Sequence, residues 1–130
     1  MSQAFCSLEG KNALVTGGAS GLGAATLLFS GWSTRFFDYD NDGWKDVFVA
    51  QGHVMDTIEK TSPNLRYRQP PLLLRNVSGR FVKAAAGAAL EQDWAGRGAA
   101  FGDADNDGDI DVVMSNVGQR ALVLRNDGGN

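Results

Sequence analysis

Two short stretches of the chain concentrate carboxylate side chains at regular spacing. Residues 36–51 read FFDYDNDGWKDVFVAQ, and residues 101–116 read FGDADNDGDIDVVMSN. Counted from its first loop aspartate, each stretch has carboxylates at positions 1, 3, 5 and 9 and a glycine at position 6. Alternate side chains of a tight loop can converge on one cation, and the glycine permits the sharp turn. Because neither Cys nor His lies nearby, the pattern predicts Ca²⁺ rather than zinc.

The predicted ligands of each loop are its carboxylates and the backbone carbonyl at position 7. They are Asp38, Asp40, Asp42, Asp46 and the carbonyl of Trp44 in the first loop, and Asp103, Asp105, Asp107, Asp111 and the carbonyl of Asp109 in the second. An ordinary polar hairpin turn explains one such loop more easily than two copies of it. We expect each ion to neutralise its loop and fix the local fold, and we predict no catalytic residues.

The residues around each loop exclude an EF-hand. That motif requires a bidentate Glu at position 12, where this chain has Val49 in the first copy and Met114 in the second. The text after each loop, Val47–Val49 and Val112–Met114, is typical of a strand rather than of an amphipathic helix. The residues before each loop, 35–37 and 99–101, also suit a short strand. We therefore predict that each acidic loop joins the two strands of a hairpin.

The whole second part of the chain is repetitive. The two acidic stretches align at a shift of 65 residues, and Leu74-Arg75-Asn76 aligns with Leu124-Arg125-Asn126 at a shift of 50. A long loop, His53 to Pro71, absorbs the difference. We predict one repeat over about residues 31–95 and a second, incomplete repeat over about 96–130. The short β-branched and aromatic runs between Gly-rich and Asp-rich turns predict a mainly β fold.

The charge of the chain is concentrated in these loops. Nine of its fifteen acidic residues lie in the two stretches, whereas the net charge of all 130 residues is only −3. This balance excludes a polyanion or a typical nucleic-acid binder. Arginines 66, 68, 75 and 80 are assigned to a solvated face, and Asn76-Val77-Ser78 to a turn. No signal peptide and no membrane-spanning run is apparent, so we predict no membrane insertion.

The segments FFDYDNDGWKDVFVAQGHV, LLLRNVSGRF, RGAAFGDADNDGDIDVVMSN and LRNDGGN together resemble the FG-GAP (VCBS-type) repeats of the family related to cartilage acidic protein. In bacteria these repeats usually precede an ASPIC/UnbV domain, which this chain lacks. The resemblance implies antiparallel blades of a β-propeller, as in the integrin α-subunit head, with Ca²⁺ bound by the same aspartates. It also implies an extracellular, cell-surface or periplasmic location and a non-catalytic role in adhesion, with an unknown protein or glycan partner. About 100 residues suffice for one to two blades, so we expect a fragment of a larger propeller or association through open blade edges.

The N-terminal segment has a different sequence pattern from the repeats. Residues 7–28, SLEGKNALVTGGASGLGAATLL, resemble the start of a short-chain dehydrogenase/reductase, with a strand at Ala13–Val15, a Gly-rich turn and a helix. The catalytic Tyr-x-x-x-Lys pair of that family is missing, because Gly43 and Pro71 lie four residues after the two tyrosines. We expect residues 1–30 to be non-functional and to bind no nucleotide. The alternatives are a fragment of an NAD(P)-dependent dehydrogenase and a gene-fusion product without independent function.

Overall fold

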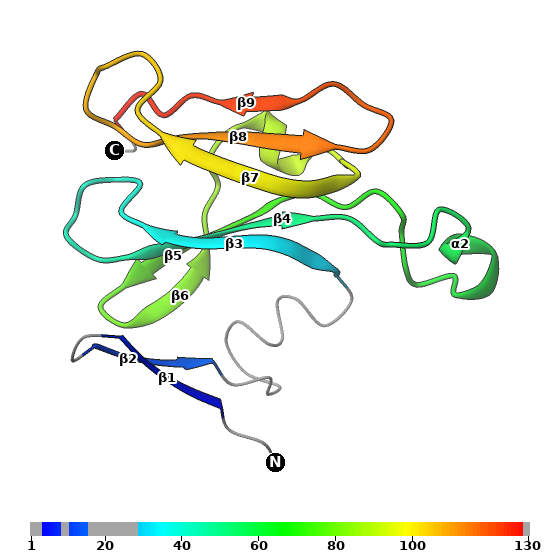
Figure 1. Cartoon of the computed structure of the whole chain (residues 1–130), viewed down its shortest axis with the longest axis horizontal. Helices are drawn as coiled ribbons and strands as arrows, with labels where there is room; N and C mark the ends of the chain where they lie inside the picture. Colours follow the sequence, from blue (N-terminus) through cyan, green and yellow to red (C-terminus); the bar gives the residue numbers. More distant parts are fainter. Residues whose placement is uncertain (1–3, 9–10, 16–28, 129–130) are drawn as a thin grey trace.

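The computed structural model describes residues 4–8, 11–15 and 29–128, and this part of the chain is mainly β (Figure 1). Strand β1 (Ala4–Leu8) pairs antiparallel with β2 (Lys11–Val15). The predicted strand Ala13–Val15 lies within β2, whereas β1 was not predicted from the sequence. The predicted Gly-rich turn and helix at residues 16–28 lie outside the described residues. None of the described helices is long and apolar enough to cross a membrane.

The first repeat forms a four-stranded antiparallel sheet. Its strands are β3 (Gly31–Phe37), β4 (Asp46–Gln51), β5 (Leu72–Val77) and β6 (Arg80–Lys83), and they lie side by side in chain order. The long connection from β4 to β5 contains the short helix α2 (Ile58–Thr61). The turn between β5 and β6 closes with Ser78 and Gly79 at positive φ, and the side chain of Asn76 accepts a hydrogen bond from the Gly79 N–H at 2.8 Å. The turn therefore lies at Ser78 and Gly79, whereas Asn76 and Val77, which were predicted to be in it, are the last residues of β5.

The second repeat forms a three-stranded antiparallel sheet with the same order of strands. The strands are β7 (Gly96–Gly102), β8 (Asp111–Asn116) and β9 (Leu122–Leu124), and a 3-10 turn, η1 (Ala88–Glu91), precedes them. The first hairpin of each sheet carries an irregularity at the same place, between Gly31 and Ser33 and between Gly96 and Gly98. The prediction of antiparallel hairpins, each joined by an acidic loop, is thus confirmed.

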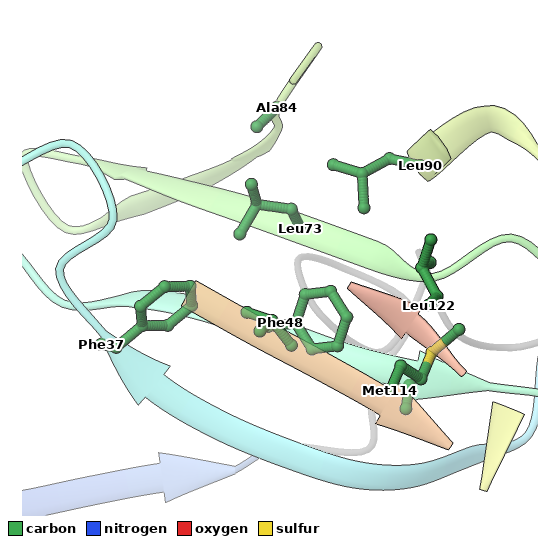
Figure 2. Close-up of a cluster of buried hydrophobic side chains, with 9 residues drawn as sticks. Phe37, Phe48, Leu73, Ala84, Leu90, Met114 and Leu122 are labelled. Carbon is green, nitrogen blue, oxygen red and sulfur yellow. The ribbon is translucent and has the colours of Figure 1, made fainter. Parts of the chain in front are cut away.

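The larger of the buried hydrophobic clusters among the described residues lies between the two sheets (Figure 2). Phe48 of β4 and Met114 of β8 are almost completely buried there. The ring of Phe101 contacts those of Phe37 and Phe48, with ring centroids 5.5 and 5.8 Å apart. Burying one such side chain contributes about 1.5–3 kcal/mol to the free energy of unfolding. The core therefore holds the two hairpins, and with them the two acidic loops, in a fixed relation.

Equivalent positions of the two sheets differ in exposure: they are buried in the first sheet and exposed on the outer face of the second. Phe48 and Leu73 of the first sheet are 1% and 6% exposed, and their equivalents in the second sheet are Val113 and Val123. These two valines are paired across β8 and β9 and are 39% and 62% exposed. The second repeat thus presents, on its outer face, the positions with which the first repeat contacts its neighbour.

Candidate metal centre

The two acidic loops adopt the same backbone conformation. Each follows the first strand of its sheet and ends at the start of the second, at Asp46 and at Asp111. The residue at position 4 has positive φ in both copies, 56° at Asn41 and 69° at Asn106. The glycine at position 6 also has positive φ, 87° in the first loop and 98° in the second. Asparagine and glycine tolerate this region, so the sequence fits these tight turns.

The carboxylate of the first aspartate in each loop accepts hydrogen bonds from backbone N–H groups later in the same loop. The carboxylate of Asp38 accepts hydrogen bonds from the N–H groups of Asp42 and Gly43, at 3.1 and 2.9 Å. Asp103 accepts from Asn106, Asp107 and Gly108, at 2.6, 3.1 and 2.9 Å. These bonds point the carboxylate toward the inside of the turn. They also place the first aspartate beside the ones that follow it.

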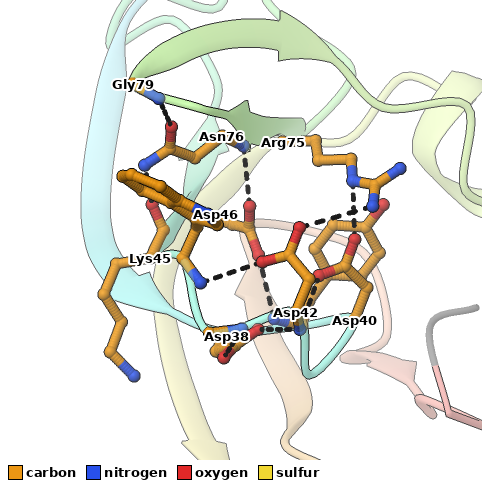
Figure 3. Close-up of polar contacts among 11 residues, drawn as sticks. Asp38, Asp40, Asp42, Lys45, Asp46, Arg75, Asn76 and Gly79 are labelled. Carbon is orange, nitrogen blue, oxygen red and sulfur yellow. Dashed lines mark hydrogen bonds and ion pairs between the residues drawn. The ribbon is translucent and has the colours of Figure 1, made fainter.

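The aspartate at position 9 has a role that the sequence did not reveal. Asp46 is fully buried, and its two oxygens accept from the N–H groups of Tyr39 at 3.0 Å and Asn76 at 2.8 Å (Figure 3). Asp111 makes the equivalent pair of bonds, to the N–H groups of Ala104 and Asn126, both at 2.8 Å. This carboxylate therefore connects its own loop to the third strand of the sheet, or to the residues directly after that strand.

We call Asp46 and Asp111 the clamping carboxylates, because each joins its loop to a later part of the sheet. Their equivalent contacts do not give them the same pKa. Burial raises the pKa of Asp46, although the N–H groups of Asn76 and Tyr39 oppose that shift. The N–H groups of Asn126 and Ala104 lower the pKa of Asp111. Asp40 and Asp42 add repulsion at Asp46, whereas Arg125 adds attraction at Asp111. Desolvation, followed by the charges of Asp107 and Asp111, raises the pKa of Asp105 in the second loop.

Arg75 contacts the first loop, so its assignment to a merely solvated face was wrong. Its Nε atom lies 2.6 Å from Oδ2 of Asp40, and its Nη2 atom lies 3.4 Å from Oδ2 of Asp42. The charge of Asp40 accordingly raises the pKa of Arg75. Asp40 is almost completely buried, and a buried carboxylate needs such a partner because removal from water penalises its charge. The signal in the sequence was the repeated Leu-Arg-Asn motif, which recurs where the third strand of each sheet ends.

The residues at position 7 differ between the loops. The side chain of Trp44 is about half exposed. The backbone N–H of Trp44 donates a hydrogen bond to Oδ1 of Asp42 at 2.9 Å. The N–H of Asp109 makes the same bond to Asp107. The Asp109 carboxylate accepts a hydrogen bond from the side chain of Asn41 at 2.5 Å, which links the second loop to the first. The assignment of the Trp44 and Asp109 carbonyls as ligands stays a prediction.

Each loop brings three carboxylates close enough to share one cation. In the first loop the convergent set is Asp38, Asp40 and Asp42, and in the second it is Asp103, Asp105 and Asp111, with ligand oxygens within 4.8 Å of one another. Asp46 and Asp107 belong to neither set, although both were predicted as ligands. An all-oxygen donor set in a flexible turn fits Ca²⁺, which accepts several oxygens with loose geometry. The arrangement therefore has the chemistry of a hard-cation site.

A family model described as an FG-GAP-like repeat matches residues 38–114, which are more than half of the chain. The matched range begins at the first aspartate of the first loop and contains the whole of the second loop. No curated protein and no solved structure matches the chain. The Gly-rich turn of the dehydrogenase-like segment, Thr16 to Gly23, lies outside both the matched range and the described residues.

Proposed function

The chain belongs to the FG-GAP-like repeat family, and we propose that it is a calcium-binding module of a β-propeller whose two aspartate loops each hold one Ca²⁺ ion. One observation carries the proposal: two hairpins in the same register each gather three carboxylate oxygens within 4.8 Å. Carboxylates this close repel one another, and a divalent cation converts that repulsion into attraction.

The proposed role of the ion is to complete the fold. Asp46 and Asp111 already join each loop to the strand region that follows, through two backbone N–H groups each. An ion held by Asp38, Asp40 and Asp42, or by Asp103, Asp105 and Asp111, would order the turn between those bonds. Because the unfolded chain has no such preformed site, the binding free energy adds to the free energy of unfolding. The proposed module is accordingly not an enzyme.

We further propose that the module mediates adhesion to a protein or glycan partner outside the cell, as its resemblance to the relatives of cartilage acidic protein with ASPIC/UnbV domains implies. Association with another blade is the contact best supported by the structure. The exposed Val113 and Val123 are equivalent to Phe48 and Leu73, which the first sheet buries against the second. The outer face of the second sheet therefore has the composition to receive a further repeat of the same kind.

Calorimetric titration of the full chain with CaCl₂ tests the calcium proposal. We expect binding at both loops, and a rise in melting temperature that EDTA reverses. At free Ca²⁺ about 100-fold above Kd, each site adds about 2.7 kcal/mol to the free energy of unfolding. The double variant Asp105→Ala, Asp107→Ala should lose the second site, whereas Asp56→Ala, Glu59→Ala removes two exposed acids outside the loops and should lose neither. Absence of heat at millimolar Ca²⁺ would refute the proposal.

Sedimentation velocity tests the proposed docking of a further blade. We expect the Ca²⁺-loaded chain to self-associate with rising concentration, because the exposed valines lose water contact on docking. The double variant Val113→Lys, Val123→Lys should stay monomeric at the same concentrations. The matched control, Val54→Lys, changes a valine that is 65% exposed on the β4–β5 connection and should associate like the unmodified chain. A monomer at all concentrations would contradict this contact.

A further inference from the structure

The arginine of the repeated Leu-Arg-Asn motif contacts the two acidic loops unequally. In the first repeat, Arg75 lies 2.6 Å from Asp40 and 3.4 Å from Asp42 through two different nitrogens. Dashed lines in Figure 3 mark the contacts of Arg75 with these aspartates. In the second repeat, the equivalent Arg125 is 3.8 Å from Asp105. The pair with Asp40 is a close ion pair, and Nη2 adds a hydrogen bond to Asp42, whereas the 3.8 Å pair of Arg125 carries no hydrogen bond. The guanidinium is therefore bound to the first loop and only near the second.

One sequence difference explains the unequal contacts. Arg125 has its short contact with Asp127, at 2.6 Å, and the residue equivalent to Asp127 in the first repeat is Val77. Valine offers no acceptor, so the loop carboxylates are the partners of Arg75. Asp127 lies outside the second loop and gives Arg125 a competing partner. The side chains of Arg125 and Asp127 are 63% and 66% exposed, so their ion pair is a surface contact of modest strength.

We infer that Arg75 is an internal competitor for Ca²⁺ at the first loop, and that Asp127 frees the second loop from the same competition. The inference rests on the proposed function. Ca²⁺ at the first loop must share or displace a guanidinium that already contacts two of its three convergent carboxylates. Two cations at such separation also repel each other. The second loop consequently binds Ca²⁺ more tightly than the first, and the residue two positions after the arginine sets the difference.

Reciprocal substitutions test the inference by calorimetric titration of the full chain with CaCl₂. Arg75→Gln should tighten the weaker site by about tenfold, because it removes one positive charge beside the ion. Val77→Asp should tighten the same site, by giving Arg75 the alternative partner that Arg125 has. Asp127→Val should weaken the tighter site by a similar factor. Arg80→Gln removes the same charge from an exposed position on β6 and should change both sites little.

The site of each effect is assigned with the variant Asp105→Ala, Asp107→Ala, which retains the first loop alone. In that background, Arg75→Gln should still tighten binding and Asp127→Val should have no effect. Val77→Asp keeps the Arg75 side chain, so it still reports if Arg75→Gln unfolds, as judged by circular dichroism. Two sites of equal affinity in the unmodified chain, or unchanged affinity in both Arg75→Gln and Val77→Asp, would overturn the inference. Absence of any Ca²⁺ binding would instead overturn the proposed function.

Discussion

The side-chain amide of Asn126 donates a hydrogen bond to the backbone carbonyl of Tyr39 at 2.7 Å, across 87 residues of sequence. The backbone N–H of Asn126 donates to Asp111, and the backbone N–H of Tyr39 donates to Asp46. These two residues thus form a hydrogen-bonded path between the clamping carboxylates of the two loops. The second contact between the loops, from Asn41 to Asp109, lies on the exposed side. The two candidate sites are therefore mechanically connected.

Replacing Asn126 by alanine should destabilise the chain. The substitution removes the donor for the Tyr39 carbonyl, and a lost bond of this kind costs about 0.5–1.5 kcal/mol. Urea denaturation in EDTA measures this effect, with the exposed Asn64→Ala as the control that should stay within about 0.5 kcal/mol of the unmodified chain. An Asn126→Ala variant as stable as the control would show that the connection does not contribute to stability.

Replacing Asp111 by asparagine should lower the melting temperature. Asparagine can accept only one of the two N–H bonds, and its amide group then faces the second N–H as another donor. We expect a decrease of about 5 °C in thermal melts without Ca²⁺. Asp56→Asn makes the same chemical change at an exposed position and should leave the melting temperature almost unchanged. A similar melting temperature for both variants would show that the two N–H bonds to Asp111 do not stabilise the fold.

The two clamping aspartates should affect stability with opposite dependence on pH. The pKa of Asp111 is lowered in the folded chain, so its contribution is complete above the unfolded value of about 3.9 and is lost as pH falls through the folded value. The pKa of Asp46 is raised, so its contribution is present below about 3.9 and is lost as pH rises through the folded value.

Comparing each Asp→Asn variant with the unmodified chain isolates these terms from the other carboxylates. In Ca²⁺-free urea denaturation, the penalty of Asp111→Asn should shrink as the pH is lowered from 7 toward about 3. The stability of the Asp46→Asn variant should instead increase, relative to that of the unmodified chain, as the pH rises through the folded pKa of Asp46. Identical pH profiles for the two variants would contradict the opposite shifts.

Replacing Gly108 by alanine should destabilise the second loop through its backbone alone. The φ angle of Gly108 is 98°, which a side chain makes unfavourable, yet an added Cβ would have no heavy atom within 4 Å. The expected cost is about 1–3 kcal/mol in urea denaturation. Gly102 has equally open surroundings without a positive φ, so Gly102→Ala is a matched control and should be nearly neutral. Equal effects at the two positions would show that backbone strain is not the cause.

Much of the loop could be predicted from local spacing because its chemistry is local. The run from Asp103 to Asp107 places alternate carboxylates on one turn, and Gly108 permits the turn whatever the rest of the chain does. The strands could be predicted for a similar reason, since β-branched and aromatic runs such as Val47–Val49 favour the pleated backbone of a strand. The long β4–β5 connection could be located only by comparing the two copies, and its helix α2 was not predicted.

The spacing of the aspartates was sufficient to predict two acidic hairpin loops, the ion chemistry that suits them, and their repetition. The donors that reach each carboxylate became known from the folded chain. Asp46 and Asp111 occupy the same position in the pattern, as do Arg75 and Arg125, yet their surroundings differ. The physical reason is that hydrogen bonds and ion pairs act over a few ångströms. Some of the residues within that distance lie in the third strand of the sheet or directly after it, fifteen to thirty-five residues away along the chain.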